Sequence, residues 1–123
     1  MWTALRLTIG LLLLAPAPAM AQFNPFQIQG GSGPPLSESD LSQMFASIAR
    51  LNAQVPVKVG SSAHWDNPAT GSYGTSTVTG VLDSAGLACH LLHHEFAAGG
   101  RMPLREYDFT WCRAADGTWK IKS

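Results

Sequence analysis

Four residues that can bind a metal ion or transfer a proton lie close together in one apolar stretch, HLLHHE. They are His90, His93, His94 and Glu95. In a β-strand, His90 and His94 point to one face. His93 and Glu95 then point to the other face. A zinc site generally requires three or four protein ligands. Because at most two of these side chains converge and no other ligand is evident nearby, we expect no metal site and no cofactor.

Serine hydrolase chemistry has candidate residues but no recognisable arrangement of them. The sequence contains no G-x-S-x-G nucleophile elbow. We therefore expect no catalytic residues and no enzymatic activity. The candidates by residue type alone are Ser61, Ser62 and Ser76 with His64, Asp66 and Asp83.

Length and composition indicate one small folded domain. The chain has 123 residues, of which 46% are hydrophobic and 13% are charged, a composition well above that of disordered proteins. The formal net charge is zero. A chain without excess positive charge has no electrostatic means of attracting nucleic acid, so we exclude a nucleic-acid-binding role.

The first residues have the features of a secretory signal peptide, which we assign to residues 1–21. Arg6 supplies a basic start, Leu7–Ala15 is apolar, and Ala19-Met20-Ala21 is a small-x-small cleavage site. The apolar run is far shorter than the roughly 20 residues that span a bilayer. We expect secretion across the inner membrane, to the periplasm or the outer membrane and cell surface, with no transmembrane segment after cleavage.

The two cysteines of the chain, Cys89 and Cys112, are predicted to form one structural disulfide. They do not form a C-x-x-C motif, and no helix N-terminus is at hand to lower the pKa of either thiol. A redox-active pair is therefore not expected.

The mature chain is predicted to consist of a linker, residues 22–35, and one α+β domain, residues 36–123. The linker is rich in Pro and Gly. An N-terminal helix follows, capped by Ser37 or Ser39, with an apolar stripe that faces the core. The stripe consists of Leu41, Met44, Phe45, Ile48 and Leu51.

About five antiparallel strands are predicted after the helix, as a meander sheet with the helix over one face. Alternating side chains predict a first strand from Val55 to Asp66, and Thr and Val predict a second at Tyr73–Val81. The remaining strands are expected at Leu87–Ala97, Met102–Arg113 and Thr118–Lys122, separated by glycine-containing turns.

A turn centred on Gly100-Arg101, of two or four residues, would place Cys89 directly opposite Cys112. In the same register Glu95 opposes Glu106, an unfavourable pair of like charges. The face expected under the helix pairs Leu92 with Phe109, His90 with Trp111 and His94 with Tyr107, while the opposite face pairs His93 with Asp108.

Three motifs in fixed order resemble the C-terminal domain of the bacterial outer-membrane surface antigen family, of which the rickettsial seventeen-kilodalton surface antigen is typical. The resemblance covers roughly Leu36 to Lys122. The motifs are a W-x-N-P-x-T-G turn, a G-x-x-C strand start and a C-R-x-x-D-G-x-W ending. They comprise Trp65, Asn67, Pro68, Thr70 and Gly71; Gly86 and Cys89; and Cys112, Arg113, Asp116, Gly117 and Trp119.

The resemblance implies an exported cell-envelope protein with a structural or interaction role and no established enzymatic activity. Its partner would be an envelope protein or peptidoglycan. The chain lacks the lipobox cysteine and the glycine-zipper segment that many relatives carry, which favours the periplasm over outer-membrane anchoring. A small periplasmic inhibitor or ligand-binding module, using the exposed sheet face or the Asn67–Gly71 turn, is the alternative.

Overall fold

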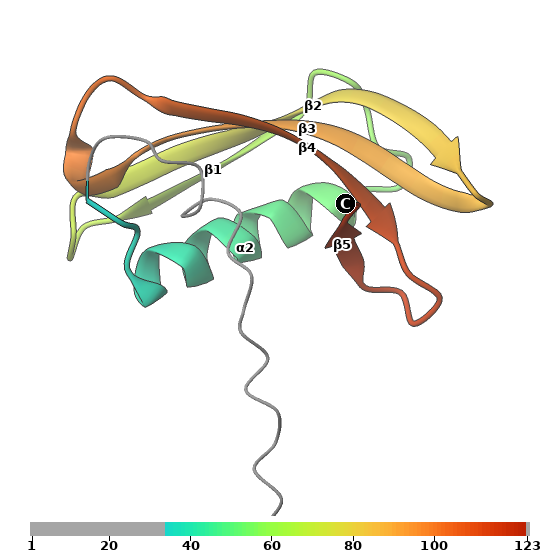
Figure 1. The fold of residues 1–123 in the computed structure, drawn as a ribbon, viewed down its shortest axis with the longest axis horizontal. Helices are drawn as coiled ribbons and strands as arrows, with labels where there is room; N and C mark the ends of the chain where they lie inside the picture. The colour runs from blue at the N-terminus through green and yellow to red at the C-terminus, as the bar shows by residue number, and fades with distance from the viewer. Residues whose placement is uncertain (1–33, 123) are drawn as a thin grey trace, which may run out of the picture.

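The computed structural model describes residues 34–122, which form one α-helix and a five-stranded antiparallel sheet in the order β1-β2-β3-β4-β5 (Figure 1). The predicted α+β meander is confirmed. The helix is not N-terminal in the chain, because it begins only at Glu38, and the predicted leader lies outside the described residues. The elements are α2 (Glu38–Asn52), β1 (Ser62–Asn67), β2 (Ser72–Ser84), β3 (Leu87–Ala97), η1 (Ala98–Gly100), β4 (Arg105–Arg113) and β5 (Trp119–Ile121).

Helix α2 begins with a capping box formed by Ser37 and Asp40. The Ser37 hydroxyl accepts a hydrogen bond from the Asp40 backbone N–H, and the Asp40 carboxylate accepts one from the Ser37 N–H. Two backbone donors that the first turn leaves unpaired are thereby satisfied. Of the two predicted capping residues, Ser37 is the one that caps the helix.

The apolar stripe of α2 packs against one face of the sheet, as predicted. Met44, Ile48 and Leu51 are buried. Phe45 is 39% exposed, because it lies at the edge of the stripe, where its ring meets Trp111 edge-on. The sheet residues in this core include Trp65, Val78, Leu92, Phe96, Tyr107 and Trp111.

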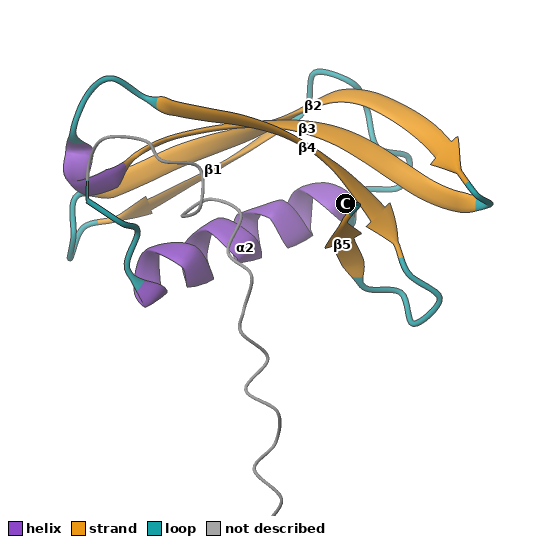
Figure 2. Cartoon of the chain, viewed as in Figure 1, coloured by secondary structure: helices purple, strands orange, loops and turns teal. Residues whose placement is uncertain are grey.

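The sheet curves over α2, and β5 descends beside the helix (Figure 1). Figure 2 shows α2 on one face of the sheet only. No other α-helix is present in residues 34–122, so the opposite face has no helix over it. That face carries the polar side chains of the central strands, including His93, Glu95 and Asp108.

The register of β3 and β4 is the predicted one, with Cys89 opposite Cys112 and Glu95 opposite Glu106. The connection is longer than expected, because it runs through η1 and the loop up to residue 104. The predicted start of β4 at Met102 is wrong, since Pro103 has no backbone N–H to pair with a neighbouring strand.

The first strand also begins later than predicted. Val57 and Val59 precede β1, and Val59 is 63% exposed. The chain turns at Gly60, whose φ of 92° suits glycine and few other residues. Gly60 donates its N–H to the Val78 carbonyl, so hydrogen bonding to β2 begins at this turn, and the strand itself begins at Ser62.

Candidate functional site

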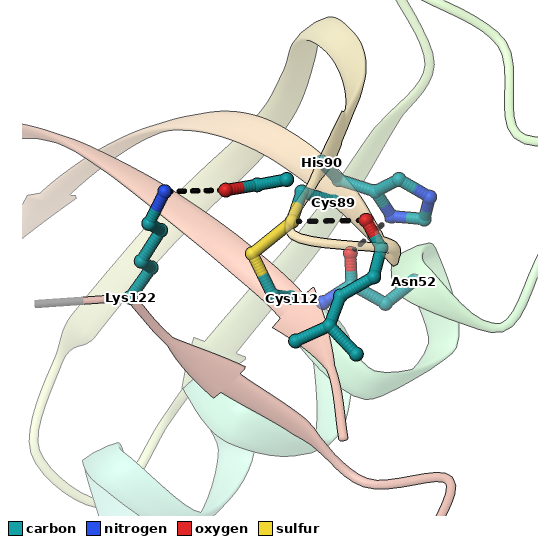
Figure 3. Close-up of a disulfide and its surroundings, with 7 residues drawn as sticks. Asn52, Cys89, His90, Cys112 and Lys122 are labelled. Carbon is teal, nitrogen blue, oxygen red and sulfur yellow. Dashed lines mark hydrogen bonds between the residues drawn. A yellow bond between two sulfur atoms is a disulfide. The ribbon is translucent and has the colours of Figure 1, made fainter. Parts of the chain in front are cut away.

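The two cysteines form a disulfide that joins β3 to β4 (Figure 3). Cys89 is fully buried and Cys112 is 8% exposed, and the S–S distance is 2.08 Å. The predicted disulfide is thus present in the structure. Because both sulfurs are bonded and enclosed, the pair offers no exposed thiol for redox chemistry.

His90 follows the disulfide on the helix-facing side of β3. Its Nδ1 lies 2.8 Å from the Asn52 side-chain oxygen at the end of α2 (Figure 3). The ring also stacks on Trp119, with centroids 4.1 Å apart. Burial lowers the pKa of His90, so a neutral ring donates from Nδ1 to Asn52 and helps to hold the helix end on the sheet.

His94 lies four residues further along β3, on the same face, and is 1% exposed. The Trp111 indole N–H donates to its Nε2 at 3.0 Å, which leaves Nδ1 to donate to the Ser76 hydroxyl at 2.6 Å. Burial lowers the pKa of His94 to about 4. Ser76 is also 1% exposed, so this serine and histidine lie inside the core, away from solvent.

His93 points to the opposite face, where its predicted contact with Asp108 is confirmed. The two side chains approach to 2.8 Å between Nδ1 and Oδ1. The other ring nitrogen, Nε2, lies 3.5 Å from a Glu106 carboxylate oxygen. The hydrogen bond with Asp108 raises the pKa of His93, although partial burial opposes it.

One expectation about the histidine-rich stretch is wrong. His93 and Glu95 do have a further potential ligand beside them, the carboxylate of Glu106 on β4. Ligand atoms of these three residues all lie within 4.8 Å of one another. This neighbour could have been predicted from the sequence, because the register that places the cysteines opposite each other also places Glu106 opposite Glu95.

The residues of the W-x-N-P-x-T-G motif lie at the turn between β1 and β2 and in the adjacent core. Trp65 is buried in the core, and Gly71 turns the chain with a φ of 77°. The Asn67 side-chain amide and the Thr70 hydroxyl both donate to the Asp40 carboxylate, at 2.8 and 2.6 Å. These motif residues therefore join the turn to the start of α2.

The remaining motif residues lie at the other end of the sheet, near the disulfide. Gly86 forms the turn between β2 and β3 with a φ of 79°. Asp116 accepts hydrogen bonds from Thr118 in the turn before β5. The two motif groups are thus at opposite ends of β2 and do not form one site.

A pocket of about 460 Å³ lies beside His90 at this second end. Its walls include the stacked His90–Trp119 pair and Arg113. Asn52 also contributes, and its buried Nδ2 has no hydrogen-bond partner among the described residues. An aromatic wall with a permanent positive charge suits a peptide or small molecule that carries a carboxylate or carbonyl group.

Among residues 34–122, neither helix combines the length and hydrophobicity of a membrane-spanning segment. No family model, no curated protein and no solved structure matches the chain.

Proposed function

We propose that this chain is an exported, non-enzymatic domain of the bacterial cell envelope that contacts another envelope component. The observation that carries the proposal is the buried disulfide between Cys89 and Cys112. Stable disulfides belong to oxidising compartments, and small exported domains depend on them because their cores are limited. The apolar leader and the resemblance to the surface antigen family support the same location.

The contacts of the two buried histidines support a non-enzymatic role. His90 holds the helix end, and His94 satisfies Trp111 and Ser76 inside the core. The motif residues Asn67 and Thr70 donate hydrogen bonds to Asp40 and join the β1–β2 turn to α2. The role of these contacts is to stabilise the fold.

Fractionation of cells that produce the chain tests the location. We expect the protein in the periplasm or with the outer membrane, with both cysteines protected from alkylation until a reductant is added. A Leu12→Arg variant, which interrupts the apolar leader, should remain in the cytosol with its cysteines reduced. Wild-type protein in the cytosol with free thiols would overturn the proposal.

A ligand-binding or inhibitor module is the second candidate, and the pocket beside His90 favours it. Capture from an envelope extract separates the two roles. Recovery of an outer-membrane protein or peptidoglycan supports envelope contact, whereas stoichiometric recovery of a soluble hydrolase supports an inhibitor.

Arg113→Gln provides a matched test of the pocket. The substitution removes the charge at the pocket, while Arg50→Gln removes an exposed charge on α2 outside it. If the pocket binds the partner, only the Arg113 variant should lose capture. Equal capture by both variants would place the contact elsewhere.

A further inference from the structure

We propose that His93, Glu95 and Glu106 bind one divalent transition-metal ion, with Zn²⁺ as the reference ion, on the sheet face opposite α2. Asp108 acts as the residue that positions His93. The site is separate from the pocket beside His90 and does not depend on the proposed envelope role.

Strand geometry brings the three ligands together. His93 and Glu95 are two residues apart on β3, so both side chains leave the same face of the sheet. Glu106 lies directly opposite Glu95 on β4. The His93 Nε2 atom is already 3.5 Å from a Glu106 oxygen, and all three ligand atoms lie within 4.8 Å of one another. Small rotations of the two glutamates would bring their oxygens to the zinc–oxygen distance of roughly 2.0–2.2 Å.

Asp108 gives His93 the orientation that a metal ligand needs. Its carboxylate lies 2.8 Å from Nδ1, so the Nδ1–H donates to Asp108 and the Nε2 lone pair points to the glutamates. Most histidines that bind metals have such a partner on their second nitrogen, because it fixes the ring and makes it a stronger ligand.

The charge arrangement favours a bound cation. Glu95 and Glu106 are like charges placed directly opposite each other, which destabilises paired strands. Within residues 34–122 no lysine or arginine forms an ion pair with either carboxylate. A divalent ion bound between the two carboxylates would offset their repulsion.

The ligand types indicate which ions would bind. One imidazole and two carboxylates suit Zn²⁺ and neighbouring transition-metal ions. Ca²⁺ and Mg²⁺ prefer sites built only from oxygen. The carboxylate side is open to solvent, since Glu106 is 61% exposed as a side chain. Three protein ligands therefore leave a coordination position for water or for a group from a partner.

Calorimetric titration of the EDTA-treated, disulfide-bonded chain with ZnCl₂ tests the site. We expect one ion per chain with micromolar or tighter affinity, and no binding of MgCl₂ or CaCl₂. His93→Asn and Glu106→Gln should each abolish the binding. Asp108→Asn should weaken it by roughly 10–100-fold, the effect usual for a residue behind a metal-binding histidine.

His64→Asn is the matched control. His64 is an exposed histidine on the same face, opposite Thr75, which in turn pairs with Glu95. It lies two strands, about 10 Å, from Glu95, so its loss should leave the affinity unchanged. The absence of zinc binding at micromolar concentration would overturn the proposal. Binding that survives His93→Asn, or that is lost in His64→Asn while all variants keep the wild-type circular dichroism spectrum, would also overturn it.

Discussion

The Thr70 hydroxyl donates a 2.6 Å hydrogen bond to the Asp40 carboxylate, joining the β1–β2 turn to the first turn of α2. Asn67 and Ser72 donate to the same carboxylate, as does the Ser37 backbone. Asp40 is only 2% exposed. Burial raises the pKa of Asp40, but these hydrogen bonds together hold it below its ordinary value. A charged side chain that caps its own helix thus also holds the helix on the sheet.

Asp40→Ala should lower the free energy of unfolding by roughly 3 kcal/mol, because it leaves several buried donors without an acceptor. Urea denaturation monitored by circular dichroism measures the change. Glu38→Ala is the control: it removes an exposed acid from the same helical turn and should cost at most about 0.5 kcal/mol. Equal losses in the two variants would show that the helix dipole, and not the buried contacts of Asp40, is responsible.

The lowered pKa of Asp40 also fixes the sign of its pH effect. Its contribution is fully present above the pKa of the carboxyl in the unfolded chain, and it is lost as the pH falls through the lower pKa of the folded protein. Urea denaturation of Asp40→Asn should therefore show less loss of stability in acid than the wild type. If Asp40→Asn loses as much stability in acid as the wild type, the acid sensitivity does not come from Asp40.

The sequence was most informative where a local pattern also determined pairing. The strand alternation of residues 87–97, with two cysteines that had to meet, was sufficient to predict the register of β3 and β4. The partners of Asp40 could not be predicted in this way. Asn67, Thr70 and Ser72 lie 27 to 32 residues away from it, and no periodicity links a helix cap to a distant turn.

A single residue can delay the start of a strand although the side-chain pattern continues. Val57 and Val59 continue the alternation of β1, but the turn at Gly60 separates them from the sheet. The metal ligands illustrate a different failure, because Glu106 lies outside the histidine-rich stretch. It becomes a neighbour of His93 only when the strand register is applied across both faces of the sheet.

Removal of the disulfide should lower the free energy of unfolding by about 3 kcal/mol, as expected for cross-linked residues separated by 23 positions. The reason is that the cross-link restricts the unfolded chain. The comparison is urea denaturation of the wild type and of the Cys89→Ala/Cys112→Ala variant. A reductant should destabilise the wild type and leave the double variant unchanged. Equal stability of the wild type and the double variant in the absence of reductant would contradict this role.

Acidification should destabilise the fold through His94. Its pKa is about 4 in the folded protein against an ordinary 6.5, so the unfolded chain binds the proton first. The free energy of unfolding should therefore decrease as the pH falls from about 6.5 to about 4, by roughly 3 kcal/mol, and this contribution should be constant below that range. A positive charge on nearby His93 strengthens the effect, and Asp108 opposes it.

Urea denaturation at a series of pH values, with EDTA present, measures this dependence. His94→Gln should be less stable at neutral pH but should lose much of the slope between pH 4 and 6.5. A smaller slope should remain, because burial also lowers the pKa of His90. A slope between pH 4 and 6.5 that is as steep in His94→Gln as in the wild type would assign the acid sensitivity to another group.

Gly74→Ala should disrupt the core near the start of β2. A Cβ atom at this position would lie 2.7 Å from both the Glu95 carbonyl oxygen and the Trp65 indole nitrogen, and 2.9 Å from the Phe96 Cβ. The backbone of β3 cannot move away without breaking its pairing with β2, so we expect the free energy of unfolding to fall by about 3 kcal/mol.

Gly80→Ala, on the same strand, is the control, because its new Cβ meets only the flexible Leu91 side chain, at 3.3 Å. That variant should lie within about 1 kcal/mol of the wild type, because alanine also restricts the unfolded chain. Thermal unfolding of the two variants should therefore separate them clearly, and equal midpoints would contradict the close approach of β3 to Gly74.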